Sequence, residues 1–244
     1  MMLCKETDPE HTMTNTAFSK QGSSQKRAST TKGSKGGRPA SGTLEQRLEQ
    51  LLEDSTQVFV QHGYGSTSMD LIARKAHVAK RTIYQHFGGK EQLFGAVVRH
   101  RINSLYALFP EIEKTTDPIE QVLTRFAHEL LAVVLAPESI NLERIVIGEA
   151  SRFPELANQF YNNAPKQAIV AIAQYLTRQK QKGILQLTDP EVTSMQFFSL
   201  VLGEFQRQAL LGIGQPYSTE QIDRHVDEAI RFFLNAYQAE TVIN

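Results

Sequence analysis

The chain has one cysteine, Cys4, and no tryptophan. A single thiol forms neither an intramolecular disulfide nor a cluster of thiolate ligands, so we expect no disulfide framework and no cysteine-bound metal. Long apolar runs are also missing, because no stretch approaches the ~18 uncharged apolar residues of a membrane span. The first residues are polar and basic, unlike a signal peptide. We therefore expect a cytoplasmic protein without a membrane partner.

The sequence also lacks an excess of charge of either sign, because 26 lysines and arginines balance 26 aspartates and glutamates. The balance hides a gradient. Residues 1–43 carry a net charge of +4, residues 44–107 carry +2 and residues 108–244 carry −6. A basic first half and an acidic second half fit a protein that binds nucleic acid at one end only. A chance fluctuation in composition is the alternative interpretation.

Enzyme motifs are missing as well. The sequence has no HExxH zinc motif, nucleophile elbow, phosphate-binding loop or dinucleotide fingerprint, and its seven histidines are dispersed. We therefore expect no catalytic residues, no metal site and no cofactor.

Helical periodicity begins at residue 44 and continues to the end of the chain, with no alternation typical of β-strands. Residues 1–43 are rich in Ser, Thr, Gly and Lys and are expected to form a disordered basic arm. The prediction is an all-α protein with a three-helix DNA-binding domain over residues 44–108. Residues 109–244 are expected to form a helical bundle.

Several helix boundaries are marked by capping signals. We expect helices over 44–62, 67–77, 79–86 and 90–108, the first ending at Gly63 and the second capped by Thr67. Asp117-Pro118, Asp189-Pro190 and Ser218 to Gln221 are further start signals, and two long helices, 190–211 and 219–240, are expected last.

Residues 67–94 read TSMDLIARKAHVAKRTIYQHFGGKEQLF. Two short helices joined by a turn of three or four residues are typical of a helix-turn-helix. On the second helix an inward stripe is expected from Val78, Ala79, Ile83 and Phe87. The opposite face presents cationic and hydrogen-bonding side chains that suit a major groove: Lys80, Arg81, Tyr84 and Gln85. An ordinary solvated face is the alternative.

Further DNA contacts are expected around this helix. The hydroxyls of Thr67, Ser68 and Thr82 are candidate phosphate ligands. His86 is a further candidate, and Lys90 follows two glycines at a helix start, where backbone amides and an ammonium converge on one phosphate. Arg38, in the basic arm, is a candidate for an adjacent minor groove, with a solubilising tail as the alternative.

The region 44–108 closely resembles the DNA-binding domain of the TetR family of bacterial regulators. The resemblance is carried by short motifs in the same register over four helices: Gly63-Tyr64, Thr67-Ser68, Ile72-Ala73, Ala76-x-Val78, Thr82-Ile83-Tyr84-x-His86-Phe87 and Lys90-Glu91-x-Leu93. It implies an all-helical homodimer that binds a palindromic operator in double-stranded DNA.

Two residues depart from the family pattern. His77 stands where the family usually has glycine, so a non-glycine residue is expected at a turn position that often needs positive φ. Ala79 replaces the usual serine, which removes a side-chain cap from the recognition helix.

Residues 140–212 resemble the C-terminal domain of an AefR-like subgroup of TetR regulators, most clearly in the run Arg144 to Leu156. This resemblance implies a ligand-sensing bundle. The two last helices are expected to dimerise through an apolar stripe, part of which must be core. Its residues are Phe197, Phe198, Val201, Leu202, Phe205, Ile222, Val226, Ile230, Phe233, Leu234 and Tyr237.

Polar residues on apolar helices are the candidates for ligand contact, and an apolar lining with few polar groups suggests a small hydrophobic molecule. They are His128, Glu149, Arg152, Glu204 and Arg207. The sequence thus predicts a homodimeric repressor that such a ligand releases from its operator. The alternative is a helix-turn-helix protein without a small-molecule ligand, acting as an activator or controlled by a protein partner.

Overall fold

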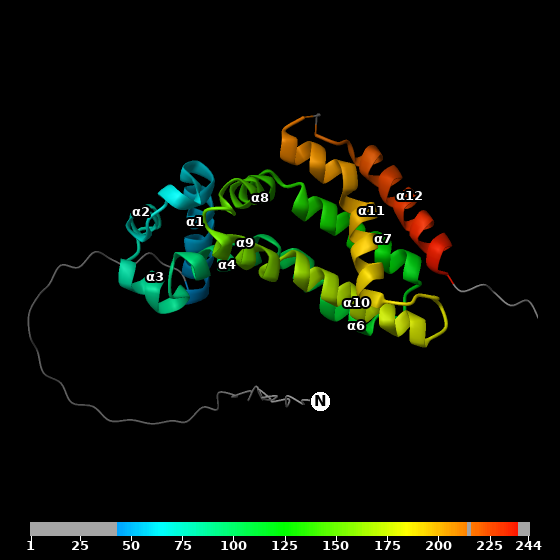
Figure 1. Ribbon diagram of the computed structural model, residues 1–244. Coiled ribbons are helices and arrows are strands. Elements are labelled where there is room, and N and C mark those ends of the chain that lie inside the picture. Colours follow the sequence, from blue (N-terminus) through cyan, green and yellow to red (C-terminus); the bar gives the residue numbers. More distant parts are fainter. Residues whose placement is uncertain (1–42, 214–215, 239–244) are drawn as a thin grey trace, which may run out of the picture. The chain divides into compact units, whose positions relative to one another are not determined.

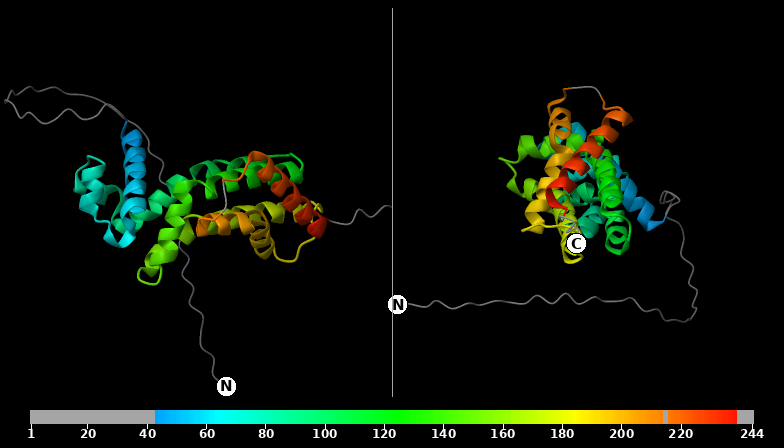
Figure 2. Two further views of the ribbon diagram at one scale, coloured as in Figure 1. Left: turned by 90° about the horizontal axis from the view of Figure 1, so that it is seen from above. Right: turned by 90° about the vertical axis from the view of Figure 1, so that its right-hand side faces the viewer.

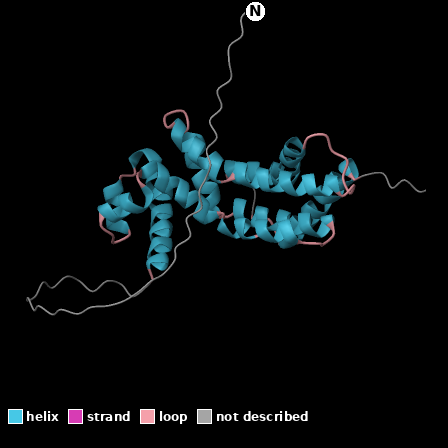
Figure 3. Ribbon diagram, turned by 90° about the horizontal axis from the view of Figure 1, so that it is seen from below, coloured by secondary structure: helices cyan, strands magenta, loops and turns pink. Residues whose placement is uncertain are grey.

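The computed structural model describes residues 43–213 and 216–238. Within them the chain forms twelve α-helices and no strand (Figures 1 and 3), apart from an isolated bridge between Leu185 and Gln238. The all-α fold expected from the sequence is confirmed. Arg38 and the arm predicted over 1–43 fall outside the described residues, except for Thr43. The helices are α1 (Leu44–Ser66), α2 (Met69–Lys75), α3 (Lys80–Phe87), α4 (Lys90–Arg101), α5 (Asn103–Ala107), α6 (Phe109–Lys114), α7 (Ile119–Val134), α8 (Pro137–Glu149), α9 (Pro154–Asn163), α10 (Pro165–Gln181), α11 (Pro190–Leu211) and α12 (Thr219–Tyr237).

Two clusters of buried apolar side chains hold these helices together. The first joins α1–α4 to α8 and α9 and contains Phe59, Ile83 and Phe94. The second joins α5–α7 to α10–α12 and contains Phe126 and Phe197. In Figures 1 and 2, α1, α2 and α3 lie together, and α11 lies beside α12. Helices α8 and α9 therefore share a core with the helix-turn-helix, although they follow it by some fifty residues in the sequence.

The helix expected over 90–108 is interrupted at Ile102, where φ is −105° and ψ is 16°. Before the break, Leu93 and Val97 are buried in the first cluster, and after it Leu105 is buried in the second. The interruption therefore comes where the chain passes from one core to the other, which the local periodicity does not reveal.

The capping predictions are confirmed at two helices and wrong at two. Asp189 accepts from the amides of Glu191 and Val192 at the start of α11, and Ser218 forms a capping box with Gln221 at α12. By contrast, α7 begins without a side-chain cap after Pro118. The carboxylate of Asp117 instead lies 4.0 Å from Arg125 Nη1, and its amide donates to Thr115 Oγ1.

The second correction concerns α2, which is capped by Ser68 rather than Thr67. Ser68 Oγ accepts from the amide of Leu71 at 3.2 Å. Thr67 is 2% exposed, and its hydroxyl donates to the carbonyl of Gly63 at 2.6 Å. The turn after α1 therefore uses Thr67 to satisfy a helix-end carbonyl, and the next residue becomes the cap.

Most of the apolar stripe on α11 and α12 belongs to the core of a single chain. Phe197, Val201 and Phe233 are fully buried in the second cluster. The apolar side chains that these helices expose are different ones: Val192, Met195, Leu211 and Phe232. The most exposed apolar side chains of these helices therefore lie outside the stripe that the periodicity singled out, whose remaining members are at most partly exposed. None of the described helices is long and apolar enough to cross a membrane.

Candidate nucleic-acid interface

The turn between α2 and α3 has a non-glycine residue, His77, at its left-handed position. His77 has a φ of 52°, the only positive value at a non-glycine residue in the described part of the chain. The amide of Val78 donates to the carbonyl of Ala73 at 3.1 Å and closes the turn. His77 thus has the positive φ expected at this turn position, and α3 begins at Lys80 without a side-chain cap at Ala79, as expected.

Helix α3 presents its polar residues to solvent and anchors itself through Ile83, which is fully buried. Val78 and Phe87 pack partly buried against the same core. Ala79 is exposed, so its predicted inward position is wrong, because it lies in the extended cap before the helix. The side chains expected to face the major groove are all exposed: Lys80, Arg81, Tyr84 and Gln85. His86 is exposed beside them, and Thr82 is half-buried.

Lys80 forms an exposed ion pair with Asp70 of α2, with 2.8 Å between Nζ and Oδ2. The hydrogen bond to Asp70 raises the pKa of Lys80, so its ammonium is charged at neutral pH. A phosphate would compete with this carboxylate for the same ammonium. The pair orients the lysine along the outer face of the helix-turn-helix.

Lys90, expected at a phosphate, fastens α4 to the end of α1. Its Nζ donates to the carbonyls of Tyr64 and Thr67 at 2.9 and 3.0 Å and lies 4.3 Å from the centre of the Tyr64 ring. Desolvation lowers the pKa of Lys90, and the nearby carboxylates of Glu149 and Glu155 partly offset that shift. One ammonium hydrogen remains for any other partner.

The amides of Tyr64 and Gly65 donate to Glu149, the last residue of α8. Their distances to its two carboxylate oxygens are both 2.7 Å. A Cβ on Gly65 would lie 2.8 Å from Oε2, and Gly63 has a φ of 75°, so glycine is needed at both positions for the carboxylate to approach this closely. Glu149 therefore joins α8 directly to the turn that precedes the helix-turn-helix.

The ring of Tyr64 completes this junction. It packs against Phe59, Phe94 and Phe153, with ring centres 5.3–5.9 Å away. Burial, together with nearby carboxylates, raises the pKa of Tyr64 to about 12, so the phenol stays neutral. A second set of contacts ties α4 to α1 and α8: Arg101 lies 3.5 Å from Glu53 and 3.1 Å from Glu138.

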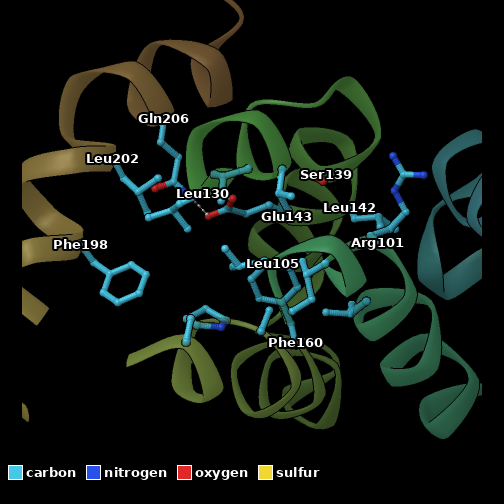
Figure 4. Close-up of a pocket in the computed structure, with 17 residues that line it drawn as sticks. Arg101, Leu105, Leu130, Ser139, Leu142, Glu143, Phe160, Phe198, Leu202 and Gln206 are labelled. Atoms are coloured by element: carbon cyan, nitrogen blue, oxygen red, sulfur yellow. Dashed lines mark hydrogen bonds between the residues drawn. The ribbon is translucent and has the colours of Figure 1, made fainter. Parts of the chain in front are cut away.

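An apolar cavity lies among α4, α5, α7, α8, α10 and α11, with further lining from α9 (Figure 4). Its walls are mostly aliphatic and include the rings of Phe160 and Phe198. Four polar side chains also line it: Arg101, Ser139, Glu143 and Gln206. Gln206 Nε2 donates to both carboxylate oxygens of Glu143, at 3.0 and 2.9 Å.

None of the five residues expected at a ligand lines this cavity. His128 of α7 lies 2.8 Å from Asp223 of α12, and Glu149 binds the backbone at Tyr64 and Gly65. Arg152 lies over the ring of Phe153, and Glu204 pairs with Arg207 on the exposed side of α11. Ligand contact by these residues stays a prediction, and the geometry gives each of them a partner within the protein.

The four polar residues that line the cavity are absent from the set that the sequence predicts. Glu143 carried a usable signal, since it follows Ile140 by three residues and precedes Val146 by three, and both are buried. A carboxylate within an apolar stripe indicates either a buried pair or a ligand. Gln206 carried no such signal, because only the packing of α11 against α8 brings it to Glu143.

Two family profiles match the chain. The profile for bacterial regulatory proteins of the tetR family matches residues 51–97, and the profile for the C-terminal domain of AefR-like transcriptional repressors matches residues 121–239. Together they cover the helix-turn-helix and most of the helices that follow it.

Solved structures and curated relatives agree with these profiles. A TetR-family regulator from Mesorhizobium loti is 27% identical with a TM-score of 0.69, and the flavonoid-responsive regulator FrrA is 31% identical with a TM-score of 0.67. Each alignment covers 81% of this chain and 100% of the other. The transcriptional activator FasR of Mycolicibacterium smegmatis is 36% identical over 93 residues, which are 35% of this chain and 42% of FasR. The chain therefore belongs to the TetR family of DNA-binding transcriptional regulators.

Proposed function

We propose that this protein is a homodimeric repressor that binds a palindromic operator through α3 and leaves it when a small hydrophobic molecule occupies the cavity. The observation that carries the DNA-binding part is the outer face of α3. Four exposed groove-compatible side chains stand there on a helix whose inner face is anchored by the fully buried Ile83. A rigidly seated reading helix is what base recognition requires.

The proposed contacts divide into two kinds. Arg81 and Gln85 project furthest from the core side of α3 and suit base edges, because arginine pairs with guanine and glutamine with adenine. Lys80, Tyr84 and the flanking Ser68 suit phosphate oxygens. Thr67 is buried and Lys90 is largely engaged within the protein, so both support the interface from behind rather than through direct contact.

Ligand control is supported by two helices, α4 and α8, that line the cavity and also contact the reading head. By reading head we mean helices α1–α3, which carry the helix-turn-helix. Helix α4 lines the cavity through Val98 and Arg101 and begins at Lys90, which holds the end of α1. Helix α8 lines it through Glu143 and ends at Glu149, which holds the same turn. A shift of either helix on ligand binding would tilt the head, and a coupling of about 1–3 kcal/mol is enough for a substantial change in affinity.

The effector class is supported by the lining and by one relative. The cavity is nearly all apolar, which favours a hydrophobic molecule. FrrA, which shares 31% identity over its whole length, is named a flavonoid-responsive regulator. Aromatic compounds are therefore the first effectors to test.

The test is fluorescence anisotropy on DNA from upstream of the protein's own coding region, with a scrambled duplex as control and a salt titration. We expect sequence-specific binding with a steep negative slope of log affinity against log salt. The variant K80A/Y84A should lose the binding, and an aromatic effector should release the wild-type protein. Equal weak binding of both duplexes, unchanged in the variant, would contradict the proposal.

An activator without a small-molecule ligand is the second candidate, since FasR, the relative matched over 93 residues, is named an activator. A reporter gene behind the operator separates the two. Deletion of the regulator raises expression if it represses and lowers expression if it activates.

A further inference from the structure

Two of the four polar side chains that line the cavity, Ser139 and Glu143, come from α8 and form a polar wall. Ser139 and Glu143 are one helical turn apart, so their side chains lie on the same face of the helix. Figure 4 shows both beside the cavity, with Gln206 reaching Glu143 from α11. The remaining lining near them is apolar, including Leu130, Leu142 and Leu202. A ligand would therefore be held by dispersion on most of its surface and by hydrogen bonds at one edge.

This wall has unused hydrogen-bonding capacity. Ser139 Oγ is buried and has no partner among the described residues, and the same holds for Arg101 Nε. A buried hydroxyl without a partner is destabilising, so a hydrogen-bonding group on a ligand would find a ready partner here. Glu143 has lone pairs beyond those that Gln206 uses, because a carboxylate accepts about four hydrogen bonds. Glu143 and Ser139 thus offer a free acceptor and an unpaired hydroxyl one turn apart on α8, and the Nε–H of Arg101 is a further unpaired donor in the lining.

The size and walls of the cavity restrict what enters. Its volume is about 110 Å³, and engineered apolar cavities of roughly 150 Å³ bind benzene. One six-membered ring is therefore the unit that fits. Phe160 and Phe198 both line the cavity, and aromatic side chains pack well against an aromatic ring at an edge or an offset face.

We propose, building on the ligand-released repressor above, that the effector is a phenol, or a larger aromatic that enters by a phenolic ring. Its hydroxyl donates to the carboxylate of Glu143 and accepts from the hydroxyl of Ser139. A hydroxyl both donates and accepts, so it can serve a carboxylate and an unpaired hydroxyl on the same wall.

Other head groups fit less well. A carboxylate on the ligand could reach the guanidinium of Arg101, but that group already pairs with Glu53 and Glu138, and the carboxylate of Glu143 would repel the ligand in an apolar surrounding. An ammonium could donate to both Ser139 and Glu143, but it would have to leave water for an apolar cavity, and the guanidinium of Arg101 adds a like charge nearby. A methyl ether accepts but does not donate, so Glu143 would gain nothing from it.

The experiment is calorimetric titration of the full-length protein with four matched ring compounds: phenol, anisole, benzoate and benzylamine. We expect phenol to bind at least about tenfold more tightly than the other three, as a hydrogen bond to a charged group implies. In E143L phenol should fall to the level of anisole, while anisole stays unchanged. E111L, which alters an exposed carboxylate on α6, is the matched control and should behave as wild type.

Several outcomes overturn the proposal. Equal binding of phenol and anisole, tightest binding of benzylamine or of benzoate, or no binding of any compound each removes the phenolic hydroxyl as the recognised group. If E143L does not fold, the S139A variant provides the second test. Its affinity for phenol should be about threefold to tenfold lower than that of the wild type. Phenol affinity unchanged in S139A would equally contradict the assignment.

Operator release is measured separately, which keeps the two proposals distinguishable. If phenol binds in the cavity and saturating phenol leaves the operator complex intact, the phenol site stands and ligand-controlled repression fails. If another hydrophobic compound releases the operator while phenol does not bind, repression stands and the phenolic assignment fails.

Discussion

At the scale of single residues, the same side-chain type serves different ends according to its burial. Tyr64 is buried in an aromatic cluster, whereas Tyr84 is 45% exposed on the outer face of α3. Glu149 accepts hydrogen bonds from two backbone amides, whereas Glu143 faces a cavity. Residue type and spacing alone therefore do not show whether such a side chain supports the fold or faces DNA or a ligand. Single substitutions can distinguish the two roles.

Tyr84→Ala should weaken operator binding about tenfold, because the phenol is expected to donate to a phosphate oxygen. Dimerisation and thermal stability should stay as in wild type, since the ring is exposed. Anisotropy with the operator duplex measures the first and light scattering the second. The matched control is Tyr161→Ala on α9, whose side chain is 51% exposed. Equal loss of affinity in both variants would refute a specific role for Tyr84.

Gly65→Ala should lower the free energy of unfolding by about 1–3 kcal/mol, because the new Cβ would lie 2.8 Å from Glu149 Oε2. Gly148→Ala is the control, since a Cβ there meets nothing within 4 Å and the residue is inside α8. That variant should be more stable by about 0.5–1 kcal/mol. Urea unfolding measures both, and opposite signs are expected; equal signs would mean that the contact with Glu149 does not matter.

Glu143→Gln should stabilise the ligand-free protein at neutral pH, and less so at acidic pH. Burial raises the pKa of Glu143, partly offset by the hydrogen bond from Gln206. The folded state then holds a proton that the unfolded state has lost, so wild-type stability falls as pH rises through the folded pKa, while the amide does not titrate. Thermal unfolding of both proteins between pH 4 and pH 8 tests this. A difference that shrinks as pH rises would contradict the sign.

At the scale of elements, α8 connects α11 to the turn before the helix-turn-helix. Glu143 contacts Gln206 on α11, and Arg144 donates to the carbonyls of Ala209 and Leu210 at the end of the same helix. Glu149, at the other end of α8, binds the turn before the helix-turn-helix. The thirteen residues of α8 thus link α11, which has exposed apolar side chains, to the reading head. Helix α4 forms a second link between the cavity and the reading head.

Glu149→Ala should remove both hydrogen bonds to the amides of Tyr64 and Gly65 and cost about 2–3 kcal/mol of stability. The operator affinity should fall as well, because the turn that positions α2 loses its anchor. Glu111→Ala, another carboxylate deletion, is the control. Unfolding and anisotropy are measured on the same preparations. Unchanged operator affinity in a folded Glu149→Ala protein would show that α4 alone positions the head.

At the scale of the whole molecule, the exposed apolar side chains of α11 and α12 mark the expected dimer surface. Phe232 is 64% exposed, and it borders a groove with Ser199 and Leu200 of α11. Val192 and Met195 are also exposed on α11. A helical pair that exposes an aromatic anchor suits a symmetric four-helix interface.

Phe232→Glu should weaken the dimer by more than about 2 kcal/mol, since it places a charge where an aromatic anchor is expected. Operator binding should fall with it, because two half-sites need two heads. Ile147→Glu on α8, at a side chain 62% exposed, is the matched control and should stay dimeric. Sedimentation velocity over a concentration series gives the answer; a dimer as stable as wild type would place the interface elsewhere.

Much of the fold follows from local rules that the sequence carries by itself. Helical periodicity, the caps at Asp189 and Ser218, and the alternation of Ile83 with exposed cations on α3 are all short-range features. They depend on residues within one or two turns of each other, so they can be read without the fold. The position of His77 at positive φ was likewise indicated by its place in the motif.

Tertiary structure decided what depends on contacts between distant segments. The break at Ile102 comes from a change of core, and the pairing of Glu149 with the amide of Tyr64 spans 85 residues. The junction of Glu143 with Gln206 spans 63 residues. Such contacts are set by how helices pack, which no local pattern encodes. The sequence by itself thus determined the reading helix, and packing alone decided where the cavity lies and which helices tie it to that helix.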